Sequence, residues 1–500
     1  MISKVYSAIP YGYEGRIVEV EGDMNRGLPS FNIVGMANKT INEAKERVRS
    51  ALTNSGFTFP DKKVTINLAP ADLLKDGSYL DLPIALSVLI LSKQLLESDV
   101  ENRLFVGELS LDGKIRPIRG IINILKAAKA SGISEIYLPS KNFEQASLLS
   151  GLNIIAVDNL HDLFLHLKKE KELINPKIVV KNKETDTTAP IFDHIRGQSF
   201  AKRALSIAIA GHHNILISGP PGAGKTLLAR AAANLLPAPS PEEKIAITKI
   251  YSIAHNSSDV IDFRPFRSPH HTASSVSIIG GGAHAEPGEI SLAHLGVLFL
   301  DEIPEFPRSV LEALRQPLED KTISISRANL KTTYPADFML IATMNPCPCG
   351  YYGDPTHECT CTSNQILAYT KKLSGPLFDR IDMNISVQKV DNSDLLKPLK
   401  SSTEEHTVVK NKISDAIKRQ RARYHKDDIF NSSLSSHQVS TLLKLSKSAE
   451  QFLYNASKKL DLSARSYFKV IKVAQTIADL DNADEITEAH ISESLNFRKR

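Results

Sequence analysis

The chain has 500 residues, of which 42% are hydrophobic and 23% charged, and its formal net charge is +5. This length predicts about three domains, and the composition excludes wholesale disorder. The charge is too small to require nucleic acid, but it permits local basic surfaces. The chain has no run of about 18 apolar residues and no secretory signal pattern at its N-terminus, so we expect a cytoplasmic protein without membrane contact.

Residues 1–170 predict a domain that mixes strands and helices. The clearest elements are two strands and two helices, at residues 64–68, 136–139, 41–52 and 123–130. Residues 171–190 are polar and poor in aromatic side chains, which is typical of a linker.

Residues 191–390 alternate short apolar runs with helical patterns. The runs at residues 215–218, 297–300 and 338–343 are typical of a parallel sheet covered on both faces, which makes this domain α/β. Residues 391–500 predict a helical domain, with amphipathic segments at residues 413–424, 448–460 and 464–480.

A phosphate-loop pattern, G-x-x-x-x-G-K-T, lies between the predicted strand at 215–218 and a predicted helix at 227–236. Its eight positions are Gly219, Pro220, Pro221, Gly222, Ala223, Gly224, Lys225 and Thr226. The glycines let backbone N–H groups surround phosphates, Lys225 supplies a charge, and Thr226 supplies a ligand for Mg²⁺. The pattern predicts a site for ATP and Mg²⁺; the alternative is a glycine-rich turn.

Polar residues follow the next two predicted strands. Asp301 suits a ligand of Mg²⁺, and Glu302 suits a group that polarises the attacking water. Their alternative role is to cap the helix that follows. Asn345 ends the third strand and is suited to orient that water, unless it only forms a turn before Pro346.

All four cysteines lie in one short segment, as two C-x-C pairs separated by nine residues: Cys347, Cys349, Cys359 and Cys361. Four thiolates match a tetrahedral zinc site in number, although the C-x-C spacing is tighter than usual. Free thiols and a redox role remain alternatives. His357 is a spare candidate ligand, whereas His270 and His271 are expected to form local hydrogen bonds.

Six further segments resemble the magnesium chelatase-like group of AAA+ ATPases, and within it the ComM (YifB-like) competence family. They are residues 267–272, 280–282, 287–294, 296–302, 345–350 and 374–382. The resemblance covers essentially the whole chain. It implies a ring-forming, hexameric ATPase with a helix-2 insert at about 270–290 and a C-terminal helical lid. It also implies that Arg380 reaches into a neighbouring subunit's site, unless it only pairs with Asp379 or Asp382 of its own chain. Arg465 would be the lid arginine, unless it is an ordinary exposed helix residue.

The same resemblance implies a DNA motor that drives branch migration during natural transformation, acting on single-stranded and branched DNA. The insert and a hairpin at residues 320–334 would point into the ring pore. Arg327 and Lys331 on the hairpin are then candidate phosphate contacts, unless they are only solvated charges. The rival functions are a magnesium chelatase-type motor that remodels a protein, an ATP-dependent protease, and an assembly factor that binds no DNA.

Three segments of the first domain, residues 75–80, 107–114 and 119–122, resemble stretches of Lon proteases. The resemblance implies that residues 1–170 form a Lon-protease-like (S5-like) α+β domain. In that resemblance Tyr79 occupies the position of the nucleophilic serine and Ile122 that of the catalytic lysine. A Ser–Lys dyad needs a hydroxyl and an amine base, so we expect no protease activity. Ser78 beside the site could restore a hydroxyl by a one-residue shift, but not the lysine.

Overall fold

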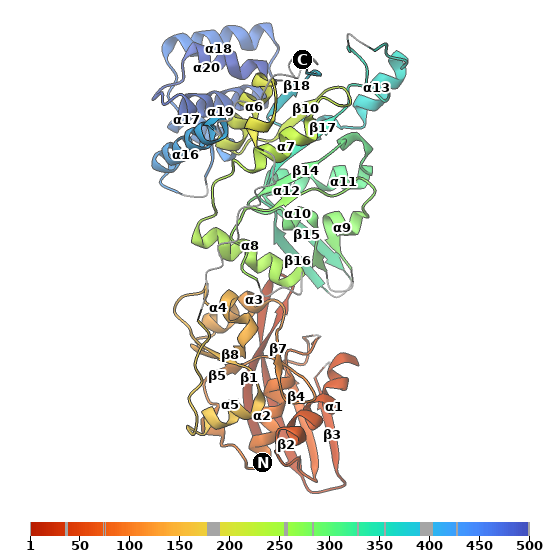
Figure 1. The fold of residues 1–500 in the computed structure, drawn as a ribbon, viewed down its shortest axis with the longest axis vertical. Coiled ribbons are helices and arrows are strands. Elements are labelled where there is room, and N and C mark those ends of the chain that lie inside the picture. The colour runs from red at the N-terminus through yellow and green to blue at the C-terminus, as the bar shows by residue number, and fades with distance from the viewer. Residues whose placement is uncertain are drawn as a thin grey trace.

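The computed structural model describes residues 2–35, 39–73, 75, 77–177, 191–254, 259–282, 285–327, 330–354, 357–390, 404–426 and 429–498. The molecule is elongated, with the N-terminal sheet at one end and the C-terminal helices at the other (Figure 1). None of the described helices is both long enough and apolar enough to cross a membrane.

A mixed seven-stranded sheet forms the N-terminal end, in the order β3-β4-β2-β1-β5-β8-β9. Its strands are β1 (Ile2–Tyr11), β2 (Glu14–Asn25), β3 (Ser30–Val34), β4 (Lys63–Ala69), β5 (Arg103–Phe105), β8 (Glu135–Pro139) and β9 (Asn153–Val157). A small pair stands apart, formed by β6 (Glu108–Leu109) and β7 (Ile115–Arg116). The helices are α1 (Lys39–Asn54), α2 (Asp81–Leu91), α3 (Ile121–Ala130), α4 (Phe143–Ala146) and α5 (Leu160–Leu167). Every residue of α2 is buried, as expected of a helix that is apolar on all sides.

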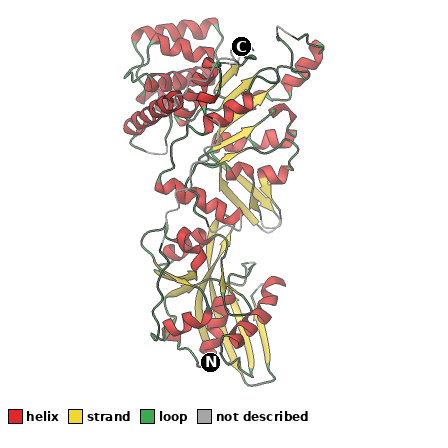
Figure 2. Ribbon diagram, viewed as in Figure 1, coloured by secondary structure: helices red, strands yellow, loops and turns green. Residues whose placement is uncertain are grey.

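A parallel sheet forms the middle of the molecule (Figure 2). It has five strands in the order β11-β14-β17-β10-β18. Its strands are β10 (Ile215–Ser218), β11 (Phe266–Arg267), β14 (Val297–Leu300), β17 (Met339–Met344) and β18 (Met383–Ser386). Alternate residues face two separate apolar cores: Ile215 and Ile217 lie in one, and Leu216 lies in the other. The predicted parallel sheet covered on both faces is therefore confirmed.

Helices surround this sheet and continue into the C-terminal end. They are α6 (Ser199–Gly211), α7 (Lys225–Ala233), α8 (Pro241–Ala254), α9 (Ser275–Ile279), α10 (Glu289–Leu292), α11 (Arg308–Ala313), α12 (Arg315–Asp320), α13 (Ser363–Lys371) and α14 (Gly375–Phe378). The C-terminal helices are α16 (Glu404–Tyr424), α17 (Ser436–Leu442), α18 (Lys447–Lys459), α19 (Ala464–Leu480) and α20 (Glu488–Asn496). The predicted helical character of this end is confirmed for the described residues.

Two hairpins project from the parallel sheet towards the N-terminal end. The strands β12 (Gly280–Gly281) and β13 (Glu286–Pro287) form the smaller one, within the predicted insert at about 270–290, and residues 283–284 between them lie outside the described residues. The strands β15 (Thr322–Arg327) and β16 (Leu330–Pro335) form the larger one, in which Ser326 pairs with Lys331. This pairing confirms the predicted hairpin at 320–334.

The turn between β1 and β2 docks on the base of the larger hairpin. The backbone N–H of Tyr13 donates to Thr332 Oγ1 over 3.2 Å, and the Tyr13 ring meets that of Tyr334 edge-on at 5.8 Å. Lys249 Nζ lies 3.7 Å from the centre of the Tyr13 ring, and Asn123 Nδ2 donates to the Tyr13 carbonyl over 2.6 Å. Tyr13 thus joins the N-terminal sheet to both the hairpin and α8.

The close approach at this turn depends on Gly12, which has a left-handed φ of +59°. A Cβ at Gly12 would lie 2.3 Å from Thr332 Oγ1, so Gly12→Ala should displace Thr332 and break its bond to Tyr13. Gly132→Ala is the matched control, because Gly132 has φ +79° and nothing within 4 Å of a Cβ.

Both variants should lose about 1 kcal/mol of unfolding free energy from the left-handed backbone alone. Gly12→Ala should lose more and should expose the junction to limited proteolysis. Equal denaturation midpoints and equal rates of proteolysis in the two variants would show that the docking of Tyr13 on the hairpin does not stabilise the protein.

Candidate nucleotide-binding site

The carboxyl ends of three parallel strands bring the predicted site together. Ser218 of β10 pairs with Met344 of β17, and Leu300 of β14 pairs with Ala342. The N–H of Gly219 donates to the carbonyl of Met344 over 3.2 Å. The residues that follow these strands therefore share one edge of the sheet, where α/β proteins bind their ligands.

The phosphate loop joins β10 to α7. Gly222 and Gly224 both have φ +79°, with nothing within 4 Å of where a Cβ would stand, so the loop keeps open space around its backbone. Lys225 Nζ donates to the carbonyls of Gly219 and Pro220 over 2.6 and 3.0 Å, and to Asn345 Oδ1 over 3.0 Å. Burial lowers the pKa of Lys225, while Asp301 and Glu302 oppose that shift. The ammonium group is thus held inside the loop, ready to exchange carbonyl partners for phosphate oxygens.

Two oxygen ligands suitable for Mg²⁺ lie next to each other. Thr226 Oγ1 donates to the Asp301 carboxylate over 2.9 Å, so both oxygens can face one ion. The Thr343 hydroxyl also donates to Asp301, and the backbone N–H of Glu302 donates to Thr343 Oγ1 over 3.0 Å. Thr343 therefore orients both acids. The sequence prediction did not include it, although a hydroxyl on a buried strand, two residues before Asn345, was a usable signal.

The Glu302 carboxylate accepts a hydrogen bond from Asn345 Nδ2 over 3.2 Å. Its backbone is left-handed, with φ +53°, and its side chain makes no cap to the 3₁₀ turn that follows. This geometry does not support the alternative in which Glu302 only caps a helix. Asn345 touches both Lys225 and Glu302, so its side chain is engaged at the site and does not serve only a turn.

Arg380 and Arg465 lie elsewhere, and both contact Glu319. Asn214, directly before β10, donates from Nδ2 to the Arg380 carbonyl over 3.0 Å. The two arginines line a cavity of about 710 Å³ that also includes Asn214. This cavity therefore lies at the amino edge of the sheet, opposite the phosphate loop. Arg380 forms its ion pair with Glu319, whereas the alternative placed that pair with an adjacent aspartate.

The structure brings the four cysteine sulfurs together between β17 and α13, all within 4.8 Å of one another. His357 is not part of this group of possible metal ligands; its ring stacks on Tyr351 at 4.9 Å. His270 Nδ1 lies 2.8 Å from Thr272 Oγ1, which confirms the expected local hydrogen bond.

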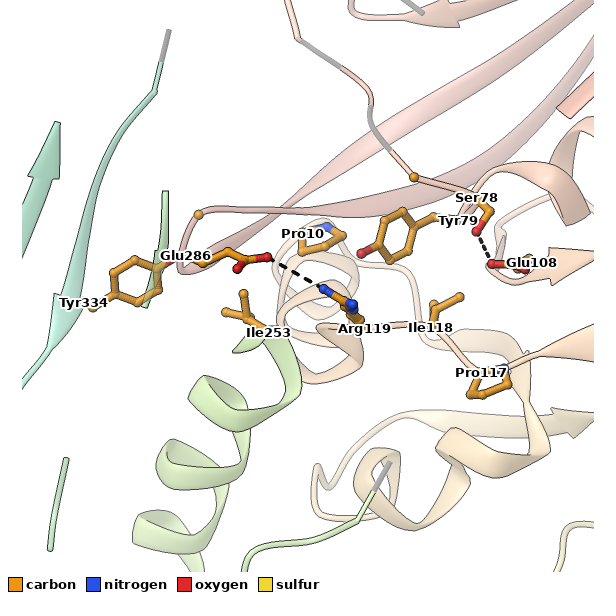
Figure 3. A pocket seen from close by; sticks show the side chains of 12 residues that line it. Pro10, Ser78, Tyr79, Glu108, Pro117, Ile118, Arg119, Ile253, Glu286 and Tyr334 are labelled. Atoms are coloured by element: carbon orange, nitrogen blue, oxygen red, sulfur yellow. Dashed lines mark hydrogen bonds and ion pairs between the residues drawn. The ribbon is translucent and has the colours of Figure 1, made fainter. Parts of the chain in front are cut away.

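Tyr79 and Ile122, at the positions of a Lon-type dyad, pack in one apolar core. Ile122 is fully buried, and the neighbouring Ser78 hydroxyl donates to the Glu108 carboxylate (Figure 3). If Ser78 took the nucleophile position in place of Tyr79, its hydroxyl would therefore pair with a carboxylate and not with the amine that a Ser–Lys dyad needs. Ser78, Tyr79 and Glu108 line a cavity of about 380 Å³ between the N-terminal sheet and the smaller hairpin, and Arg119 of its wall lies 3.7 Å from Glu286.

Of the two predicted DNA contacts, Lys331 is exposed on β16. Arg327 is the last residue of β15, and its side chain lies outside the described part of the chain.

Comparisons with known proteins assign the family. Three family models match: "Magnesium chelatase, subunit ChlI" over residues 191–395, "Subunit ChlI of Mg-chelatase" over 20–142, and "Magnesium chelatase, subunit ChlI C-terminal" over 403–498. The competence protein ComM of Haemophilus influenzae is 42% identical over 500 residues, which are 99% of this chain and 97% of the relative. YifB of Escherichia coli K12 is 40% identical over 503 residues, with the same two shares. A magnesium-chelatase 67 kDa subunit of Chlorobaculum tepidum is 26% identical over 157 residues, which are 31% of this chain and 23% of the relative.

The domain models define the class, a magnesium chelatase-like AAA+ protein, for which ATPase activity is expected. Because the likeness to ComM and YifB extends over nearly the full length of both chains, the protein belongs to the ComM/YifB family within that class.

Glu302→Gln should preserve nucleotide binding and slow ATP hydrolysis by about 100- to 10,000-fold, because the attacking water loses its carboxylate. Lys225→Ala should instead weaken binding itself, because the phosphates lose the ammonium group. Equilibrium binding of a fluorescent ATP analogue and steady-state phosphate release separate the two effects. Hydrolysis by Glu302→Gln at the parent rate would remove Glu302 from the chemistry.

Proposed function

We propose that this protein is a ring-forming, ATP-driven DNA motor of the cytoplasm that promotes branch migration during natural transformation. Its cofactors are ATP and Mg²⁺, its substrates are single-stranded and branched DNA, and its helicase action comes from pore hairpins that move with the nucleotide site. The smaller hairpin is the helix-2 insert of this proposal, and α16–α20 are its helical lid.

The observation that carries this proposal is the connection between the larger hairpin and the nucleotide site. Only residues 336–338 separate the end of β16 from the start of β17, the strand that leads to Asn345. Lys331 is exposed on that hairpin. A movement of Asn345 on hydrolysis can therefore pass along β17 to a cation that contacts DNA phosphates without reading sequence.

The placement of the arginines supports ring assembly. Arg380 lies just before β18 and the phosphate loop just after β10, and these strands are parallel neighbours. Four residues of strand span about 13 Å, so Arg380 of one chain stands too far from the phosphates of that same chain. Arg380 and Arg465 instead complete the site of an adjacent subunit, in a ring that we take to be a hexamer.

The full-length likeness favours this function over the chelatase-type alternative. The relative named as a competence protein matches 99% of the chain, whereas the chelatase subunit matches 31%. The packing of Tyr79 against the core that holds Ile122 supports a non-proteolytic role for the N-terminal domain in assembly or DNA contact.

Mixing two inactive variants tests the shared site. Arg380→Ala should bind nucleotide nearly as the parent does but hydrolyse it slowly, and Lys225→Ala should fail to bind. Rings that contain both should recover some ATPase activity, because an intact phosphate loop then meets an intact arginine. Native mass spectrometry should confirm that mixed rings form. Mixed rings without recovery would rule out action between subunits.

Replacing Arg327 and Lys331 by Ala tests the DNA function. Loss of two phosphate contacts should flatten the log–log salt slope of single-strand binding by about 1.4. DNA-stimulated ATPase and branch migration should fall, while basal ATPase should persist because the hairpin does not enter the nucleotide site. Salt titrations of binding and a strand-exchange assay on branched DNA measure these effects.

Lys62→Ala with Lys63→Ala is the matched control, because both lysines are exposed where β4 begins. Lys63 pairs with Asn25, at the end of β2 opposite the turn that docks on the hairpin. The control pair should leave the salt slope unchanged. If the hairpin variant has the parent salt slope and the parent rate of branch migration, Arg327 and Lys331 are only solvated charges, and DNA binds elsewhere on the protein.

A further inference from the structure

The cysteine segment between β17 and α13 has a sulfur cluster at its centre. The Sγ atoms of Cys347 and Cys349 lie 3.3 Å apart, and Cys359 Sγ lies 3.6 Å from each of them. Cys361 completes the group, with all four sulfurs inside 4.8 Å. The two C-x-C pairs, ten residues apart in the chain, thus converge on one point.

These distances match one kind of metal centre. Zinc binds thiolates at about 2.3 Å, so the sulfurs of a tetrahedral zinc site stand about 3.8 Å apart. An iron–sulfur cluster with four cysteine ligands spreads them over two or more irons, which needs wider spacing. Two disulfides would divide the sulfurs into separate pairs, whereas Cys359 is equidistant from Cys347 and Cys349.

The segment has almost no apolar core of its own. Among its described residues, 346–354 and 357–362, only Cys347 and Gly350 are buried. Two backbone N–H groups donate to sulfur: that of Tyr352 to Cys347 Sγ over 3.3 Å, and that of Cys349 to Cys361 Sγ over 3.4 Å. Such bonds commonly support metal-bound thiolates, and a metal can replace an absent apolar core.

The segment also touches the nucleotide site. Cys347 comes two residues after Asn345 in the sequence. Gly350, with φ +86°, packs so closely on the phosphate loop that a Cβ there would lie 2.7 Å from the Cδ and Cγ atoms of Pro221. The same Cβ would lie 4.0 Å from Cγ of Asn345. The cysteine segment therefore packs against both the phosphate loop and Asn345.

We propose that Cys347, Cys349, Cys359 and Cys361 bind one Zn²⁺, and that this ion fixes Gly350 against Pro221 and Asn345 so that the nucleotide site is held ready for phosphates. The metal has a positioning role and takes no part in the chemistry. The proposal concerns the nucleotide site alone, so it stands or falls independently of any action on DNA.

Metal content tests the first half. Protein purified without chelators should contain one zinc per chain when its metal content is measured by elemental mass spectrometry. Its four thiols should react slowly with a thiol reagent until a zinc chelator is added. Cys359→Ser with Cys361→Ser should contain none. His357→Ala should keep the zinc, because its ring stacks on Tyr351 outside the sulfur cluster. Iron in place of zinc, two disulfides per chain, or four reactive thiols after growth with zinc would each overturn the site.

Glycine variants test the second half without removing the metal. Gly350→Ala should keep one zinc per chain yet bind Mg²⁺–ATP several-fold more weakly, because the new methyl group displaces Pro221. Gly353→Ala is the matched control: its φ is +79° and nothing lies within 4 Å of a Cβ, so metal content and affinity should both stay at the parent values.

Zinc removal should also weaken Mg²⁺–ATP binding, as Gly350→Ala does. Where the double serine variant does not fold by circular dichroism, parent protein treated with chelator provides the comparison, and added zinc should restore its affinity. If the zinc-free protein and Gly350→Ala both bind Mg²⁺–ATP with the parent affinity, the positioning role is refuted, even where the parent protein is shown to contain zinc.

Discussion

The hydrogen-bond register of the parallel sheet is the constraint on which the site depends. Pairing of Ser218 with Met344 and of Leu300 with Ala342 places the ends of three strands at one edge. Side chains alternate along a strand, so a slip of one residue would turn each apolar residue to the opposite face. The two cores on either side therefore fix the register, and the register fixes how closely Lys225, Asp301 and Asn345 approach one another.

The same parallel arrangement separates the arginines from the phosphates. Residues before the strands, such as Asn214 and Arg380, share the amino edge, where Glu319 lies between the two arginine side chains. The Glu319 carboxylate contacts both guanidinium groups, and in the proposed ring the phosphates of a neighbouring subunit's nucleotide would replace it. Strand direction thus places the phosphate loop at one edge of the sheet and the two arginines at the opposite edge, as the proposed ring assembly requires.

The local pieces of this structure could be predicted from the sequence, because strands, helices and the phosphate loop follow from short-range patterns. The strand at 297–300 and the helix at 464–480 agree with the observed β14 and α19. The pattern extended α7 to 236, whereas the helix ends at Ala233. Helix ends are decided by local geometry that apolar periodicity does not record.

Contacts between distant segments could not be predicted in this way. Tyr13 and Thr332 are 319 residues apart in sequence, and neither carries a motif that indicates the other. The number of cysteines predicted that they would meet at one site. The contact of their segment with Pro221 through Gly350 could not be predicted, because it depends on the angle at which the chain leaves β17. Thr343 differs, because its hydroxyl on a buried strand was a usable signal; its partners Asp301 and Glu302, however, follow another strand.

The strand β17 connects all of these features. The larger hairpin enters it after residues 336–338, and Tyr13 of the N-terminal end docks on that hairpin through Thr332. At its other end the strand delivers Asn345 to the nucleotide site and Cys347 to the sulfur cluster. All six residues of β17 are buried, so close packing resists bending of the strand when one end is displaced. A change in the hydrogen bonds of Asn345 must then be borne by the cysteine segment on one side or passed to the hairpin on the other. In the proposed motor, a cysteine segment stiffened by zinc would leave the hairpin as the part that moves, which would explain why both features are built on the same strand.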